Sequence, residues 1–122
     1  MNKIVSITFL LLATMLVRVN GQSINTNEYV GTWNAIIIGT PGGDSKLEVK
    51  ISNIKGKLEG TITSKDDGTV EIKRIEFNQN SISVYFKHGW FTVDLEMGKT
   101  DKNHCKCKLA NRYTGQAIKQ DI

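Results

Sequence analysis

Apolar and polar residues alternate with a period of two along most of the chain from residue 29 onward. Leu47, Val49 and Ile51, for example, are separated by Glu48 and Lys50. This period indicates β-strands with one buried and one solvated face. No stretch of this region has helical periodicity. We expect about eight strands, near residues 29–38, 46–52, 58–63, 70–77, 82–86, 91–97, 105–109 and 112–119.

Short clusters of Gly, Asn and Asp separate these strands and predict tight turns. Asp67-Gly68 is a strong hairpin signal because Gly accepts positive φ. Connections this short do not allow parallel crossovers, so an all-β, antiparallel up-and-down meander is expected. We expect it to close into a small barrel in which the first and last strands pair, because closure removes exposed edges; a β-sandwich is the alternative. A slip of phase at Lys73-Arg74 predicts a β-bulge that bends the fourth strand.

Residues 1–21 are predicted to be a cleaved signal peptide. Lys3 precedes the apolar run 4–17, which is short for a membrane span and lies close to the N-terminus. A retained N-terminal anchor helix is the alternative. Cleavage leaves one domain, residues 22–122, with no integral membrane segment, so we expect a secreted or periplasmic protein. No Cys lies near the cleavage point, which argues against a lipid anchor on a processed cysteine.

The charge pattern excludes some classes of function. The chain carries 16 Lys and Arg against 12 Asp and Glu, with both signs scattered along the predicted domain. Nucleic acid is not expected as a partner, because binding would need cations clustered on one face with aromatic residues between them. The chain also lacks a Gly-x-Ser-x-Gly elbow, a zinc-protease helix and acids spaced for a shared site. We therefore expect neither an enzyme nor a cofactor.

A Gly-x-Trp pair, Gly31 and Trp33, begins the first predicted strand, and Thr100-Asp101 falls in the loop between the sixth and seventh strands. In this strand pattern the two features resemble the lipocalins and the wider calycin group of barrels. The resemblance implies that the Trp packs across the closed end of the barrel. The family's Arg just beyond the last strand, which packs over the Trp, is replaced here by Lys119. Alternatively, Trp33 simply fills the core of another small β-fold.

The inward-facing positions of the meander are almost entirely apolar, with a few small residues among them. An eight-stranded barrel either fills with side chains or holds one small ligand, and the alternation leaves both open. A ligand inside should be hydrophobic, because few inward polar groups would compensate a polar one. Arg74 and Tyr113 are the candidates to anchor a head group. The predicted ligand-binding residues are Ala35, Ile37, Gly60, Ile62, Arg74, Phe86, Phe91 and Tyr113. We expect a lipocalin-like carrier of a small hydrophobic molecule.

Alternate turns of a meander lie at the same end of the barrel, and four of them should form a polar rim. In lipocalins this end is the open one. The rim residues are predicted to be Asp44, Asp66, Asp67, His88 and Arg112. The alternative function is a protein- or glycan-interaction module that uses this rim over a solid core. Asp, Asn and Gly are also what tight turns need for backbone reasons alone.

The stretch His104 to Lys108 contains both cysteines and one of the two histidines. On a strand, Cys105 and Cys107 share one face while His104 lies on the other, so no zinc site is expected. A disulfide between residues two apart in a strand is strained. We favour two buried free thiols that pack as small core residues. The unusual disulfide and an intermolecular bridge remain alternatives.

Overall fold

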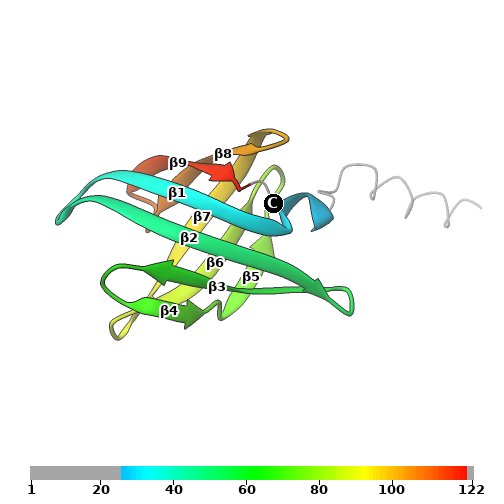
Figure 1. Ribbon diagram of the computed structural model, residues 1–122, viewed down its shortest axis with the longest axis horizontal. Helices are drawn as coiled ribbons and strands as arrows, with labels where there is room; N and C mark the ends of the chain where they lie inside the picture. The colour runs from blue at the N-terminus through cyan, green and yellow to red at the C-terminus, as the bar shows by residue number, and fades with distance from the viewer. Residues whose placement is uncertain (1–25, 121–122) are drawn as a thin grey trace, which may run out of the picture.

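The computed structural model describes residues 26–120 (Figure 1). The predicted signal peptide, residues 1–21, lies outside them. A 3₁₀ helix, η1 (Thr26–Tyr29), precedes nine strands. The strands are β1 (Gly31–Thr40), β2 (Gly43–Ile54), β3 (Lys57–Ser64), β4 (Gly68–Glu71), β5 (Arg74–Phe77), β6 (Ile82–His88), β7 (Phe91–Asp101), β8 (His104–Leu109) and β9 (Tyr113–Lys119).

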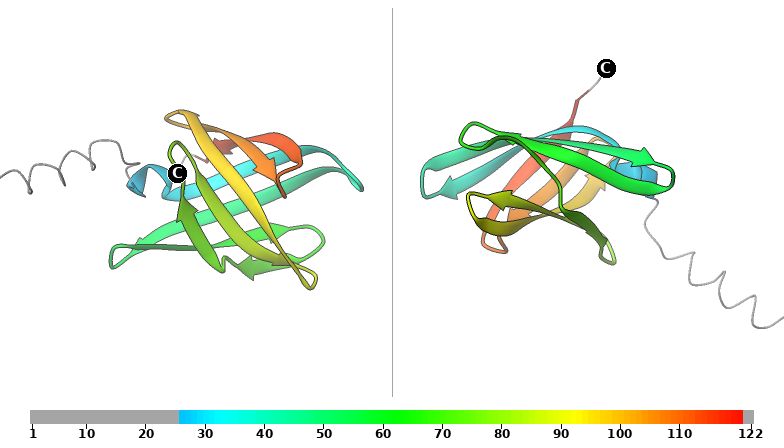
Figure 2. Two further views of the ribbon diagram at one scale, coloured as in Figure 1. Left: turned by 180° about the vertical axis from the view of Figure 1, so that it is seen from behind. Right: turned by 90° about the horizontal axis from the view of Figure 1, so that it is seen from below.

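The strands form one antiparallel sheet in the order β4-β3-β2-β1-β9-β8-β7-β6-β5. The predicted all-β antiparallel meander is therefore confirmed. The first and last strands also pair as expected, with Ala35 opposite Ala117. Figure 2 shows that the sheet coils on itself, so that β5 and β6 lie across from β2 and β3. No helix among residues 26–120 is long and apolar enough to cross a membrane.

The sheet is not closed into a barrel, and the expected fourth strand is the reason. Residues 70–77 do not form one strand with a β-bulge: β4 pairs with β3, β5 pairs with β6, and the two lie at opposite edges of the sheet. The chain changes edges between Ile72 and Lys73. The Ile72 N–H donates to Gly60 O at 2.9 Å, and the Lys73 N–H donates to Tyr85 O at 2.7 Å. Nine strands therefore replace the eight expected.

The core lies between the inward faces of the coiled sheet. It contains the residues that the alternation placed inward on β2, β6 and the middle of β7, together with Trp33 and both cysteines. Its buried apolar members are Tyr29, Trp33, Ala35, Ile37, Leu47, Val49, Ile51, Leu58, Ile62, Ile82, Val84, Phe86, Leu95, Met97, Cys105, Cys107 and Ala117. Trp33 and Ile37 expose none of their surface.

The antiparallel order sorts the turns into two ends. The β1–β2, β3–β4, β6–β7 and β8–β9 turns lie at one end, which we call the rim end, as the sequence predicted. The β2–β3, β5–β6 and β7–β8 turns lie at the other end with η1, and we call it the Trp33 end (Figure 1). His88 and His104 accordingly lie at opposite ends.

Candidate functional site

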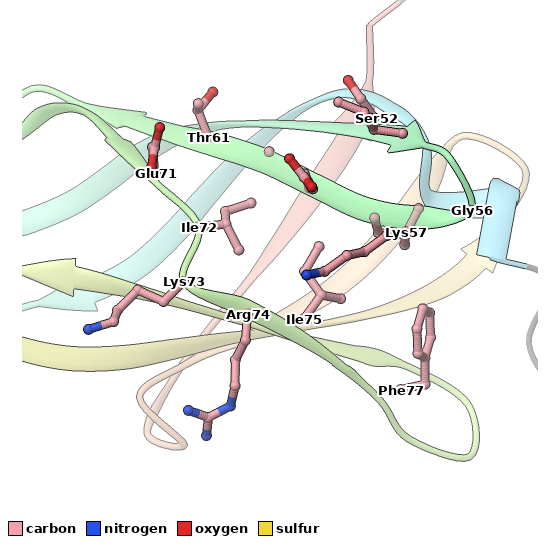
Figure 3. Close-up of a pocket in the computed structure, with 14 residues that line it drawn as sticks. Ser52, Gly56, Lys57, Thr61, Glu71, Ile72, Lys73, Arg74, Ile75 and Phe77 are labelled. Atoms are coloured by element: carbon pink, nitrogen blue, oxygen red, sulfur yellow. The ribbon is translucent and has the colours of Figure 1, made fainter.

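A cleft of about 580 Å³ lies where β3 and β5 diverge (Figure 3). The edge of β3 before Thr61 has no partner strand on this side, because the β3–β4 ladder covers only Thr61 to Ser64. β5 is likewise paired only on its β6 side. The cleft is thus the interruption in the sheet. It is lined by Ser52, Ile54, Gly56, Lys57, Leu58, Glu59, Gly60, Thr61, Glu71, Ile72, Lys73, Arg74, Ile75 and Phe77.

The floor of the cleft is apolar and continuous with the core. Leu58 is a buried member of the core cluster, and half-buried Ile72 and Ile75 pack against that cluster. Ile54 and Phe77 leave about half of their surface exposed, at 50% and 48%. An apolar ligand would therefore cover surface that now faces water, which is the main source of affinity in such clefts.

Lys57 is the cation best placed to meet a ligand in the cleft. In Figure 3 its side chain extends from β3 toward Ile75, across the opening. Within residues 26–120 no hydrogen bond or ion pair engages its ammonium group. Glu59 and Glu71 also line the cleft, but both are exposed. The cleft therefore combines an apolar floor with an unengaged positive charge.

Arg74, the predicted anchor for a head group, lines the cleft but is already engaged. Its Nε donates to Glu76 at 3.0 Å, and its guanidinium lies 3.9 Å from the centre of the Tyr85 ring. The hydrogen bond to Glu76 raises the pKa of the exposed Arg74. Tyr85 donates to the other oxygen of Glu76 at 3.1 Å. Figure 3 shows the guanidinium extending away from the opening.

Gly60 is the other predicted ligand-binding residue that lines the cleft, but it does not leave space for a ligand. A Cβ built on Gly60 would lie 1.9 Å from the backbone oxygen of Lys50 on β2. Glycine is required here because two backbones approach closely. The remaining six predicted ligand-binding residues lie away from the cleft.

Four of those six residues are enclosed by the core. Ala35, Ile37, Ile62 and Phe86 are all buried, and water reaches at most 5% of any of them. No water-sized space therefore adjoins Ile37, which exposes none of its surface. A ligand in the interior would have to displace core side chains. The role of these four residues in binding stays a prediction.

Phe91 and Tyr113, the last two, lie toward the rim end. Phe91 is 64% exposed, so it is not enclosed as expected: it is in phase with the inward-facing Val93 and Leu95, but it is the first residue of β7, beside the β6–β7 turn. Tyr113 is half-buried against the core, with the Arg112 guanidinium 5.6 Å from its ring centre.

The rim residues lie at one end, and the structure brings one pair together. His88 Nδ1 and Asp67 Oδ2 lie 2.5 Å apart, which joins the β6–β7 and β3–β4 turns. Asp44 is used within its own turn, where Oδ1 accepts the Gly39 N–H at 3.0 Å. Asp66 and Arg112 are exposed.

The Trp33 end is closed by a group of four residues. The Trp33 indole N–H donates to Tyr29 O at 3.0 Å, and the ring centres lie 6.4 Å apart. Lys119 Nζ lies 5.5 Å from the centre of the Trp33 ring, within the range of a cation–π contact. Gly31 has φ +138°, and a Cβ there would lie 2.7 Å from Lys119 Cε. Lys119 thus lies over the Trp33 ring and beside Gly31.

The cysteines are buried and free, as favoured from the sequence. Burial raises the pKa of both Cys105 and Cys107 to about 12. His104 lies on the opposite face and contacts Asp101 Oδ1 through Nδ1 at 2.8 Å; this hydrogen bond lowers the pKa of Asp101. No group of three or more His, Cys, Asp and Glu within residues 26–120 could hold a metal ion.

A second hollow, of about 840 Å³, lies on the outer face of the sheet over β1, β7, β8 and β9. Exposed Ile36, Ile38 and Ile118 line it, beside Lys106 and Lys108. It lies mostly over the outward faces of paired strands and meets the core cluster only at Cys107, whereas the β3–β5 cleft meets that cluster at Leu58, Ile72 and Ile75. The cleft between β3 and β5 is therefore the stronger candidate for a ligand.

No protein-family model matches this chain, and no curated protein or solved structure shows significant similarity to it. The candidate site consequently depends on the geometry alone.

Two features of the candidate site were missed from the sequence. Lys57 was not among the predicted site residues, because alternation does not reveal that the neighbouring edge of β3 is unpaired. Ile75 and Phe77 were assigned to a continuous strand. The slip of phase at Lys73-Arg74 was the available signal, because a break between two strands produces such a slip just as a β-bulge does.

Proposed function

We propose that this protein is a secreted or periplasmic, lipocalin-like binding protein without enzymatic activity, and that it takes up a small amphipathic molecule in the cleft between β3 and β5. The apolar part of the ligand would cover Leu58, Ile72 and Ile75. Its anionic head group would meet Lys57. The observation that carries this proposal is the apolar cleft continuous with the core, bordered by Lys57, whose ammonium group has no partner among residues 26–120.

The closed Trp33 end supports the lipocalin-like part of the proposal. Gly31, Trp33 and a covering cation lie together, with Lys119 in place of the family's Arg. The binding site differs from the one expected from the sequence. The interior positions Ala35, Ile37 and Ile62 are already covered by neighbouring side chains, whereas the cleft is open to solvent.

The test is a titration with dansylaminoundecanoic acid, a fatty-acid analogue whose emission shifts to the blue when water is excluded. We expect saturable binding with a Kd of about 10 µM. Ile75→Asp, which places a charge on the apolar floor, should weaken binding at least about tenfold. Failure of the wild-type protein to bind the probe, or equal binding by a folded Ile75→Asp variant, would contradict the proposal.

A comparison of head groups tests the role of Lys57. Lys57→Gln should weaken binding of the acid about fivefold, as expected for a partly exposed ion pair worth about 1 kcal/mol. It should leave binding of dansylaminoundecanol, which has no charge, unchanged. Lys106→Gln is the matched control, because Lys106 is an exposed lysine on the outer face of β8. Equal effects of the two lysine variants would exclude Lys57 as the anchor.

A further inference from the structure

The turn between β6 and β7 carries the most exposed large apolar side chain given for the described residues. Trp90 is 84% exposed and Phe91 is 64% exposed. Their ring centres lie 5.8 Å apart and the rings are tilted by 40°. Together they form an aromatic pair at the rim end, remote from the β3–β5 cleft.

The local backbone fixes this aromatic pair in place. His88 pairs with Phe91, so Gly89 and Trp90 form a two-residue hairpin turn. Gly89 has φ +67° and Trp90 has no positive φ, the combination of a type II′ turn. A tryptophan at the tip of such a turn cannot fold back into the core. Its ring is therefore presented to solvent by a stiff support, and little conformational freedom is lost when it meets a partner.

Polar atoms without protein partners lie beside the aromatic pair. The contact between His88 Nδ1 and Asp67 Oδ2 joins this turn to the β3–β4 turn. Within residues 26–120, neither His88 Nε2 nor Asp67 Oδ1 has a hydrogen-bond partner. The Asp67 side chain is only 23% exposed, so its carboxylate is partly withdrawn from water. Because the Asp67 carboxylate only accepts, the proton of a neutral His88 lies on Nδ1 and Nε2 is an acceptor. A partner could thus donate one hydrogen bond to the imidazole and another to the carboxylate.

We propose that the rim binds a neutral oligosaccharide, with one pyranose ring stacked on Trp90 and its hydroxyl groups bonded to His88 and Asp67. A sugar ring matches one indole in size and has an apolar face surrounded by hydroxyls that both donate and accept. This site is independent of the β3–β5 cleft and of the ligand proposed there.

The surroundings of the aromatic pair favour a sugar over the two other kinds of partner. A membrane surface carries negative charge and attracts clustered cations, but Asp66 and Asp67 lie in the turn joined to this one. A stable protein interface covers about 800 Å² on each partner. Two rings flanked at once by Lys87, His88 and Asp67 offer a much smaller apolar area, which suits a single sugar ring.

The experiment is a tryptophan fluorescence titration of the purified protein with cellohexaose, chitohexaose and maltohexaose. The chain has two tryptophans, and Trp33 is fully buried, so a change on binding reports on Trp90. At least one of these sugars should bind with a Kd of about 1 mM or below. Isothermal titration calorimetry then measures the same Kd in variants that lack Trp90.

Trp90→Ala should weaken binding at least about tenfold, and Asp67→Asn or His88→Ala about fivefold. Phe77→Ala is the matched control, because Phe77 is an exposed aromatic residue in the cleft; it should leave sugar binding unchanged while it weakens binding of the fatty-acid analogue. Circular dichroism confirms the fold of each variant. No binding of any of the three sugars at about 10 mM would overturn the proposal. Sugar binding that Trp90→Ala leaves intact would also overturn it. So would sedimentation of the wild-type protein with phosphatidylcholine vesicles that is lost in the Trp90→Ala variant.

Discussion

Replacing Trp33 tests the closed end most directly, because the side chain combines three interactions that can be separated. It is fully buried, its indole N–H donates to Tyr29 O at 3.0 Å, and Lys119 Nζ lies 5.5 Å from its ring centre. Trp33→Ala removes all three. Trp33→Phe keeps most of the buried area and a ring beneath Lys119, but it removes the N–H donor.

The magnitudes follow from the buried area and the hydrogen bond. A buried tryptophan covers up to about 250 Å², and removing roughly 200 Å² of it at about 25 cal/mol per Å² costs about 5 kcal/mol. Measured truncations of buried aromatic residues cost about 3–5 kcal/mol, so we expect a loss in that range for Trp33→Ala. Trp33→Phe leaves the Tyr29 carbonyl without its donor and should cost about 1–3 kcal/mol.

The assay is guanidinium unfolding followed by far-UV circular dichroism, which does not depend on the tryptophans. With a slope of about 3 kcal/mol per molar denaturant, Trp33→Ala should lower the midpoint by roughly 1–1.7 M. The chain provides its own control: Trp90→Ala removes the other tryptophan, which is 84% exposed, and should change stability by no more than about 0.5 kcal/mol. A loss below about 1 kcal/mol for Trp33→Ala would refute the assignment of Trp33 to the closed end.

Two further predictions concern the backbone contact of Gly60 and the buried thiols. Gly60→Ala should lower the free energy of unfolding by at least about 2 kcal/mol, because the new Cβ would force the Lys50 carbonyl away. Gly42→Ala is the control and should be nearly neutral in the same unfolding assay, because Gly42 has no positive φ and a Cβ there would meet no atom within 4 Å. Cys105 and Cys107 should not react with Ellman's reagent at pH 8 until the protein is unfolded. Their pKa of about 12 lies above the unfolded value of about 8.5, so the folded state retains protons that the unfolded state loses. Stability should therefore fall as the pH rises from about 8.5. The Cys105→Ala, Cys107→Ala double variant should show a smaller fall in its unfolding midpoint over the same pH range. An unchanged dependence on pH in this variant would show that the buried thiols do not cause the fall.

Much of the fold could be predicted because the alternation in this chain is rarely broken. Leu47, Val49 and Ile51 are all buried, and the polar residues between them face outward or are half-buried. Two-residue alternation reports only which side of a strand faces the core. It does not report which neighbour a strand pairs with, and this is why the break at Lys73 was read as a bulge.

The candidate site was harder to predict because its residues are defined by pairing and by distance. Gly60 was read as space, but what matters is the Lys50 backbone 1.9 Å from where its Cβ would lie. Arg74 was read as a free cation, yet Glu76 two residues further along the same strand engages it. In the extended strand, side chains at i and i+2 share a face, so this pair could have been anticipated.

Trp90 carried a sequence signal that was overlooked. It follows Gly89 in a turn between two alternating runs, and a two-residue hairpin turn has no inward-facing position for a large ring. The same reasoning applies to Phe91, which was assigned to the inside because it begins the period of β7. At a strand end the alternation continues in the sequence after the opposing sheet has ended.

The strand break and the cleft have a single structural origin. If residues 70–77 formed one strand along β3, the edge from Lys57 to Gly60 would be paired. Instead the chain leaves β3 after the Ile72 hydrogen bond to Gly60 and joins β6 through Lys73 and Tyr85. The two edges therefore separate beyond that point, and their apolar side chains are left open to solvent. Unpaired edges of this kind invite aggregation unless something covers or blunts them. The exposed charges of Lys57, Glu59 and Lys73 along the opening blunt this edge, while the apolar floor beneath them remains accessible to a ligand.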